Sequence, residues 1–183
     1  LGAHFFTIVS RNIRMLLYEP RLSVNLALGT LRFVPQDDTE LYSSIFTWWN
    51  ILDRQMFHYD TKYNYQTGYT REVQLRRMID LVREDNVSTY CEIGMNGGHS
   101  VAAMLEANPR VTAHVFDTMQ FNYSRPIVDI LSVHDGSRFH IHMGKSQKTV
   151  RAWHKQNSSK CDLIYMDGDH TDAVMHDFKN MQK

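Results

Sequence analysis

Two short stretches of the chain combine residue types that could do chemistry. The first, Tyr90–Ser100, reads YCEIGMNGGHS, and the second, Met166–Thr171, reads MDGDHT. In the first stretch, Gly94 can adopt backbone angles closed to other residues, and Gly98 lets a following helix approach a strand or a ligand closely. A helix that begins near His99 would present unpaired N–H groups and the positive end of its dipole. This arrangement predicts a nucleotide-like ligand, as at the first strand–helix turn of a doubly wound sheet.

The spacing of the glycines is not G-x-G-x-x-G, which argues against a dinucleotide, and Glu92 instead suggests a ligand with a positive group. The pattern E-x-G-x-x-x-G resembles the first motif of class I methyltransferases, which bind S-adenosylmethionine. The resemblance implies that the cofactor is bound by Glu92, Gly94, Asn96, Gly98 and Ser100, with Glu92 near its amino-acid part. The alternative for Glu92 is a buried, hydrogen-bonded structural acid.

The second stretch, Asp-Gly-Asp-His after an apolar run, resembles the class-24 methyltransferases, which include sugar O-methyltransferases that tailor antibiotics. The resemblance implies that Asp167 contacts the cofactor and binds Mg²⁺, that Asp169 is a second ligand or a base, and that His170 is a candidate base. Oxygen ligands suit a hard divalent cation, which would lower the pKa of an acceptor hydroxyl. The alternative is that Asp169 and His170 cap the next helix.

Two further residues are candidates for cofactor contacts. Asp117 ends the second predicted strand, 25 residues after Glu92, where an acid can accept hydrogen bonds from a ribose diol. A helix-cap or loop aspartate is the alternative. Ser146 follows the third predicted strand, where related enzymes often carry Gly-Asp-Ser near the adenine. Lys145 departs from that pattern, so Ser146 as a helix N-cap stays an alternative.

Residues 70–183 alternate between strand and helix patterns. Strands are predicted at 89–93, 111–116, 138–142 and 162–166, and helices at 70–84, 99–107, 126–134, from 146 through 153, and after Thr171. Such alternation predicts an α/β fold, a doubly wound Rossmann-like parallel sheet of order 3-2-1-4. Its ligand site would lie at the switch point between the first and fourth strands.

This sheet would be incomplete, because class I methyltransferases have seven strands and the fourth strand here would be an open edge. We expect a fragment of a longer protein whose C-terminal strands cover that edge; a homo-oligomer or the N-terminal helices are alternatives. Residues 1–69 are predicted to be a helical segment and an aromatic loop. Asp38 is the expected N-cap of a helix with Ile45, Trp49 and Leu52 on its apolar stripe. The loop, 58–69, carries four tyrosines and suits either a lid or packing on its own domain.

Composition excludes several classes of function. Lys plus Arg and Asp plus Glu both number 20, so the net charge is zero and no nucleic-acid-binding surface is expected. No apolar run is long enough to span a bilayer.

Cys91 and Cys161 fall on neighbouring strands, offset by about 10 Å along the sheet, which predicts unpaired thiols. Unpaired thiols favour a reducing compartment, the cytoplasm.

Together these features predict an S-adenosylmethionine-dependent O-methyltransferase that acts on a small hydroxylated acceptor, with a divalent metal. Two alternatives are a truncated or inactive module that binds the cofactor without turnover, and a nucleotide-sugar or NAD enzyme on a similar sheet.

Overall fold

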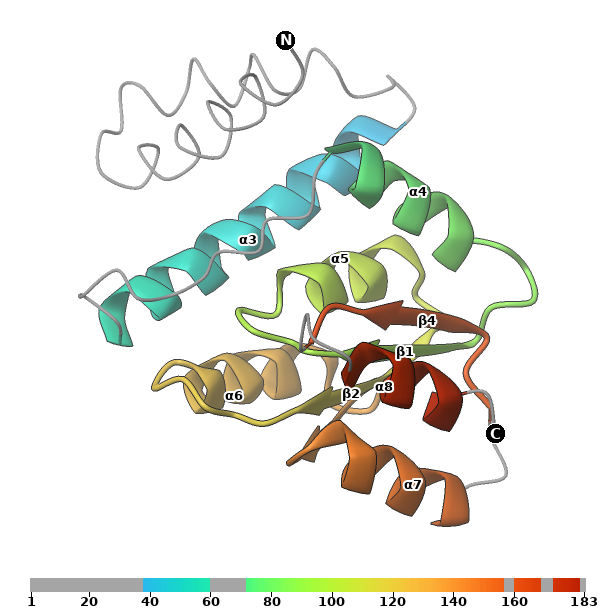
Figure 1. The fold of residues 1–183 in the computed structure, drawn as a ribbon. Coiled ribbons are helices and arrows are strands. Elements are labelled where there is room, and N and C mark those ends of the chain that lie inside the picture. Colours follow the sequence, from blue (N-terminus) through green and yellow to red (C-terminus); the bar gives the residue numbers. More distant parts are fainter. Residues whose placement is uncertain (1–37, 60–71, 157–159, 169–172, 182–183) are drawn as a thin grey trace, which may run out of the picture.

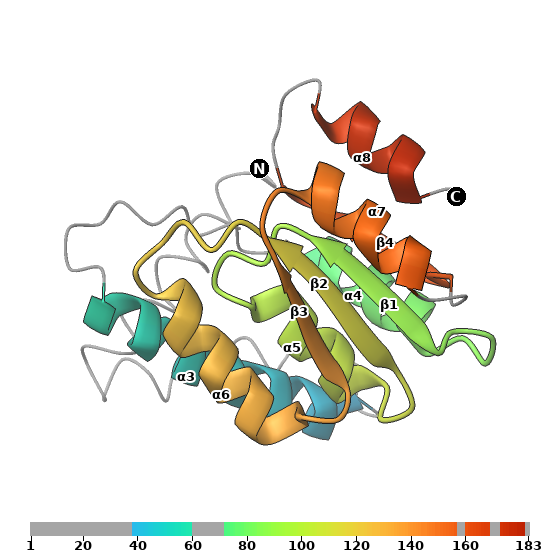
Figure 2. The same ribbon diagram turned by 90° about the horizontal axis from the view of Figure 1, so that it is seen from below.

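In the part of the chain that the structure describes, a parallel sheet of four strands forms the centre. The computed structural model describes residues 38–59, 72–156, 160–168 and 173–181. The strands are β1 (Thr89–Ile93), β2 (Thr112–Asp117), β3 (Phe139–Met143) and β4 (Leu163–Met166). They pair in parallel in the order β3-β2-β1-β4 (Figure 2). The predicted fold class and strand order are therefore confirmed.

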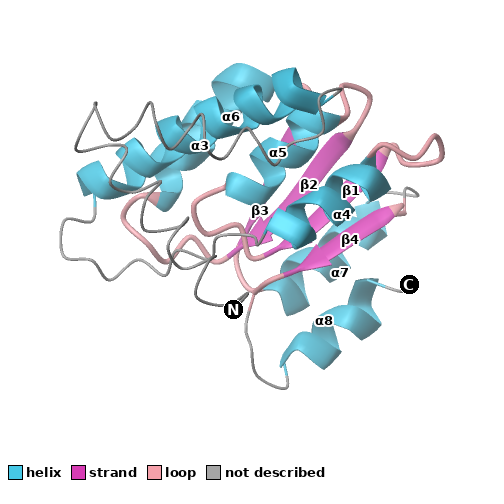
Figure 3. Ribbon diagram, turned by 90° about the horizontal axis from the view of Figure 1, so that it is seen from above, coloured by secondary structure: helices cyan, strands magenta, loops and turns pink. Residues whose placement is uncertain are grey.

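Helices cover both faces of this sheet. They are α3 (Thr39–Tyr59), α4 (Glu72–Val82), α5 (His99–Ala107), α6 (Ser124–Asp135), α7 (Ser146–Gln156) and α8 (Ala173–Met181). Helices α5 and α6 lie on one face, and α3 packs over both of them (Figures 1 and 3). Helix α4 also packs on α5, while α7 and α8 cover the opposite face (Figure 2).

Alternate side chains of β1 enter two separate apolar cores. Tyr90 belongs to the larger core, which includes residues of α3, α4, α5 and α6. Cys91 and Ile93 belong to the smaller core, together with Val150 and Trp153 of α7. Because both faces of a central parallel strand are covered, every side chain from Tyr90 to Ile93 is buried.

Helix α3 is longer than its sequence pattern predicted. It includes His58 and Tyr59, which were expected to begin the aromatic loop; the rest of that loop, 60–69, lies outside the described residues. The extension follows from the buried stripe, because Met56 comes one turn after Leu52 and is also buried. At the other end of α3, the carboxylate of Asp38 accepts a hydrogen bond from Arg83 at 2.7 Å.

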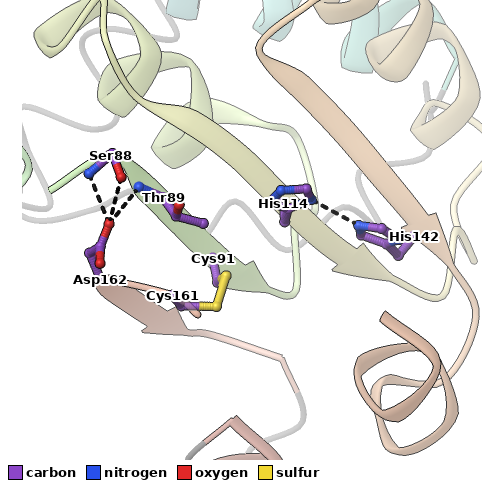
Figure 4. Close-up of a disulfide and its surroundings, with 7 residues drawn as sticks. All are labelled: Ser88, Thr89, Cys91, His114, His142, Cys161 and Asp162. Carbon is purple, nitrogen blue, oxygen red and sulfur yellow. Dashed lines mark hydrogen bonds between the residues drawn. A yellow bond between two sulfur atoms is a disulfide. The ribbon is translucent and has the colours of Figure 1, made fainter. Parts of the chain in front are cut away.

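Cys91 and Cys161 form a disulfide (Figure 4), so the prediction of unpaired thiols was wrong. That prediction assumed an extended strand through Cys161. Instead β4 begins at Leu163, and the chain bends at Asp162. The carboxylate of Asp162 accepts hydrogen bonds from the backbone N–H groups of Ser88 and Thr89, both at 2.9 Å. The bend brings the Cα atoms of the two cysteines to 5.7 Å, within the usual range for a disulfide.

None of the helices in the described ranges has both the length and the apolar character needed to cross a membrane.

Candidate functional site

A cavity of about 620 Å³ opens at the carboxyl ends of the strands. All four strand ends contribute to its wall: Gly94 follows β1, Asp117 ends β2, Gly144 follows β3 and Asp167 follows β4. Gly94 and Asp167, which come from the two motifs singled out in the sequence, therefore face the same cavity. This edge is where open parallel sheets bind their ligands.

Gly94 lies where the tips of β1 and β4 meet. Its φ of +88° is in the region that favours glycine, and an added Cβ would lie 2.5 Å from the carbonyl oxygen of Asp167. Backbone hydrogen bonds fix the positions of both residues. Gly94 N donates to Phe116 O of β2 at 2.9 Å, and Asp167 N donates to Ile93 O of β1 at 2.8 Å. A side chain at position 94 would therefore push β4 away from β1.

The rest of the glycine-rich turn leads into α5. Gly98, with a φ of +76°, is the N-cap residue of α5 and provides no side chain for a capping hydrogen bond. A Cβ at Gly98 would lie 3.0 Å from side-chain atoms of Ile127 and Leu131 in α6. Gly98 thus permits close packing between helices, while Asn96 and Ser100 line the cavity.

Asp117 holds the glycine-rich turn in place. Its Oδ2 accepts hydrogen bonds from the backbone N–H groups of Met95 at 2.7 Å and Asn96 at 3.3 Å. Its Oδ1 accepts one from Met119 N at 2.6 Å. A carboxylate can accept about four hydrogen bonds, and the described residues supply three. Asp117 can therefore organise the turn and still accept one hydrogen bond from a ligand in the cavity.

Glu92 lies behind the turn and does not line the cavity. Its side chain is fully buried and accepts hydrogen bonds from Tyr90 Oη at 2.7 Å and Ser100 Oγ at 2.6 Å. Burial raises the pKa of Glu92 to about 8; the two hydrogen bonds oppose this, and the charges of Asp167 and Asp117 add to it. The arrangement matches the structural alternative considered for Glu92, with Ser100 as its link to the cavity.

Ser146 connects two helices at the cavity wall. It begins α7, and its Oγ donates a hydrogen bond to Asp177 Oδ1 of α8 at 2.7 Å. Both residues line the cavity, together with Lys145. The hydroxyl of Ser146 therefore stabilises the packing of α7 against α8 as well as facing the site.

The second motif is described only in part. Asp167 is half-buried, and its Oδ2 accepts a hydrogen bond from Tyr165 Oη at 3.3 Å. Asp169 and His170, the predicted base candidates, lie outside the described residues. Among the residues that are described, no three His, Cys, Asp or Glu side chains come together as metal ligands. Asp167 is thus the one predicted Mg²⁺ ligand whose surroundings can be described.

Helix α3 adds residues to the site that sequence reasoning missed. Met56 of α3 lines the cavity, as does His99, the first residue of α5, which α3 contacts. His99 Nε2 lies 3.0 Å from Asp53 Oδ1, and Trp49 Nε1 donates to the backbone oxygen of His99 at 2.8 Å. One signal was available: Asp53 stands on the apolar stripe of α3, one turn after Trp49, and a buried acid requires a partner.

The C-terminal half of the chain matches a known protein family. Residues 91–183 match the model of a family described as a methyltransferase domain. No curated protein matches the sequence at a significant level.

Among the solved structures that resemble the chain are two that are described as O-methyltransferases. A candidate caffeoyl-CoA O-methyltransferase from Staphylococcus aureus aligns over 61% of this chain and 52% of its own, with 17% identity and a TM-score of 0.52. An O-methyltransferase family protein from Burkholderia thailandensis aligns over 75% of this chain and 38% of its own, with 15% identity and a TM-score of 0.37. The first likeness is one of fold, and the chain spans about half the length of that protein.

Proposed function

The chain belongs to the class-24 methyltransferase-domain family, and from this premise we propose that it is an S-adenosylmethionine-dependent methyltransferase acting on a hydroxyl group of a small acceptor. The observation that supports this most directly is the shared cavity, in which the glycine-rich turn at Gly94 faces the carboxylate-bearing end of β4 at Asp167. Its volume of about 620 Å³ falls within the range of small-molecule and cofactor sites.

The described residues fit the proposed cofactor in three respects. Asp117 keeps acceptor capacity for a ribose hydroxyl. The absence of a side chain at Gly94 lets the turn pack against the backbone of Asp167, so that both residues line one cavity. The carboxylates of Asp117 and Asp167 line the cavity and favour a ligand that carries positive charge. Further support would come from Asn96 and Gly98 in the turn, from Ser100 in α5 and from Ser146 in α7. Glu92 would act on the site through Ser100.

The proposed reaction transfers one methyl group. Bound S-adenosylmethionine supplies this group on a positively charged sulfur. Transfer would form a C–O bond at the acceptor hydroxyl and break the C–S bond of the donor, whose sulfur would keep the electron pair. The hydroxyl proton passes to a base one hydrogen bond away, for which we propose Asp169 or His170. The residues of this chain would orient the acceptor and exclude water from the site.

A divalent cation is a separate part of the proposal. Asp167 and Asp169 are its proposed ligands, in keeping with the oxygen ligands that Mg²⁺ prefers. The described residues by themselves do not complete such a site, so no step of the reaction is assigned to the metal. Turnover measured in EDTA and then with added Mg²⁺ decides this point, because full activity in EDTA would remove the metal from the proposal.

We further propose that residues 70–183 are the methyltransferase core and that residues 1–69 are an added N-terminal segment whose α3 supports the cavity. Within the described residues, β4 pairs with β1 alone. We propose that further strands, or a second copy of the chain, pair with the outer edge of β4. The expected cytoplasmic location rested on unpaired cysteines, whereas Cys91 and Cys161 form a disulfide.

Calorimetric titration with S-adenosylhomocysteine tests the proposed function. Asp117→Ala should weaken binding by about 10-fold to 100-fold, because hydrogen bonds to a charged group are worth about 1.5–3 kcal/mol. Asp85→Ala is the matched control, since the Asp85 side chain is fully exposed; its affinity should equal that of the unchanged protein. A chain that is folded by circular dichroism but gives no binding heat would refute the proposal. Binding without methyl transfer would favour a cofactor-binding module.

A further inference from the structure

Three segments of the chain have the acceptor pattern for N-linked oligosaccharide, Asn-x-Ser with x not proline. They are 86–88 (NVS), 122–124 (NYS) and 157–159 (NSS). The third lies outside the described residues. Such a pattern is short and recurs by chance. It indicates glycosylation only where its asparagine lies at the surface and where an independent feature of the chain indicates the compartment in which such oligosaccharides are attached.

The asparagines of the first two patterns differ in exposure from the other described asparagines. Asn86 is exposed in the turn between α4 and β1, and Asn122 is exposed in the turn before α6. The remaining asparagines of the described ranges are buried or half-buried, namely Asn50, Asn96, Asn108 and Asn180. Among the described asparagines, the exposed ones are therefore those that can accept an oligosaccharide.

The serine of the second pattern has no evident use in the folded protein. Ser124 is 1% exposed, and its Oγ has no hydrogen-bond partner among the described residues. A buried hydroxyl without a partner is unfavourable for folding. An acceptor pattern would account for it, because the hydroxyl is required when the oligosaccharide is attached and need not be paired afterwards.

The disulfide is independent of these patterns and indicates the same environment. Both cysteines of the chain are in it, and Cys91 is fully buried. Disulfides persist in the secretory pathway and outside the cell, and they are rare in the cytosol. The cysteines are close to the first pattern, because Ser88 Oγ donates a hydrogen bond at 3.0 Å to Asp162, the neighbour of Cys161 (Figure 4).

From these observations we propose that the chain resides in an oxidising compartment, where Asn86 and Asn122 carry N-linked oligosaccharide. Asn86 precedes the amino end of β1, whereas the cavity lies at the carboxyl ends of the strands. An oligosaccharide on Asn86 would therefore leave the cavity open. Asn122 follows Phe121, a residue of the cavity wall, so its oligosaccharide would stand beside the mouth of the site.

Mass spectrometry of the native protein tests the proposal without any assay of methyl transfer. Cells that naturally make the chain are lysed in N-ethylmaleimide, and the protein is treated with peptide N-glycosidase F in ¹⁸O water. The expected result is ¹⁸O-labelled aspartate at positions 86 and 122, together with a disulfide-linked peptide pair containing Cys91 and Cys161. Unmodified asparagine at both positions, or N-ethylmaleimide on both cysteines, would overturn it.

Variants made in the same cells assign the sites. Removal of the oligosaccharides by the glycosidase should increase the electrophoretic mobility of the unchanged protein. In Asn86→Gln and in Ser88→Ala this increase should be smaller by the contribution of one oligosaccharide, whereas Ser88→Thr should behave like the unchanged protein. Asn122→Gln should likewise reduce the mobility increase by the contribution of one oligosaccharide. Asn50→Gln, which alters an asparagine outside any acceptor pattern, is the matched control and should show the same mobility increase as the unchanged protein. Identical mobility of the unchanged protein with and without the glycosidase would contradict the assignment.

Discussion

His99 Nε2 lies 3.0 Å from Asp53 Oδ1, and this contact joins α3 to the first residue of α5. Both side chains are buried. Because α5 begins directly after the glycine-rich turn, α3 stabilises the part of the chain that forms the cavity wall. Met56, one turn after Leu52 in α3, also lines the cavity. Helix α3 is thus part of the support of the site, although it precedes β1 in the sequence.

Replacing Asp53 with alanine should therefore lower both stability and cofactor affinity. The loss of one partner in a buried polar contact costs about 1–3 kcal/mol, so urea unfolding should report a decrease of this size. Calorimetry should show weaker binding of S-adenosylhomocysteine, because the start of α5 is less well held. Asp85→Ala, at a fully exposed side chain, should change neither quantity. Unchanged unfolding of Asp53→Ala would show that the contact contributes little.

Gly94→Ala should be far more damaging than Gly168→Ala. At position 94 the new Cβ would meet the backbone of Asp167 and Gly168 at 2.5–2.7 Å, with φ at +88°. At position 168 the nearest atom is a methyl group of Ile93 at 3.1 Å, which can shift slightly. We expect the first variant to lose about 2 kcal/mol or more of stability and its cofactor binding. Similar melting temperatures and affinities in the two variants would contradict the close contact between β1 and β4.

The order of the strands and the position of the cavity could be predicted from sequence because both follow from local patterns. An apolar strand that ends in Glu-x-Gly, or in Asp-Gly-Asp, places polar side chains at the carboxyl edge of a parallel sheet whatever the details of packing. The predicted strands accordingly agree with the observed ones to within one residue at each end. Gly94, Asp117 and Asp167 therefore meet where the sequence suggested.

Contacts between distant residues could not be predicted in the same way. Asp53 and His99 are separated by 46 positions, and nothing local pairs them. The disulfide was missed because a bend at Asp162 depends on its hydrogen bonds to Ser88 and Thr89, 73 to 74 residues away. In both cases the conformation depends on a tertiary partner, which strand spacing and helix periodicity do not encode.

Glu92 should make stability depend on pH. Its pKa is raised from 4.5 to about 8 in the folded protein, so between about pH 5 and 8 the folded state keeps a proton that the unfolded state has lost. Stability should then fall with rising pH in this window by up to about 1.4 kcal/mol per pH unit. Glu92→Gln removes this titration, so its stability relative to the unchanged protein should increase from pH 5 to pH 8.

Urea unfolding of both proteins at several pH values measures this difference, and the other titrating groups cancel in the comparison. Two parallel curves would mean that Glu92 titrates alike in the folded and unfolded states. A difference that opens below pH 5 instead would point to a carboxylate whose pKa is lowered by folding, which is the opposite sign.

Reducing the Cys91–Cys161 disulfide should destabilise the protein without abolishing its fold. The bridge closes a segment with a sequence separation of 70, and a disulfide of this kind typically contributes about 2–4 kcal/mol by restricting the unfolded chain. The hydrogen bonds from Ser88 and Thr89 to Asp162 do not involve the sulfur atoms, so we expect the bend to persist after reduction and β4 to stay paired with β1. Urea unfolding of the unchanged protein in dithiothreitol should therefore match that of Cys161→Ser, and dithiothreitol should not affect the variant. If dithiothreitol leaves the unchanged protein as stable as before, the two sulfur atoms are not bonded in solution.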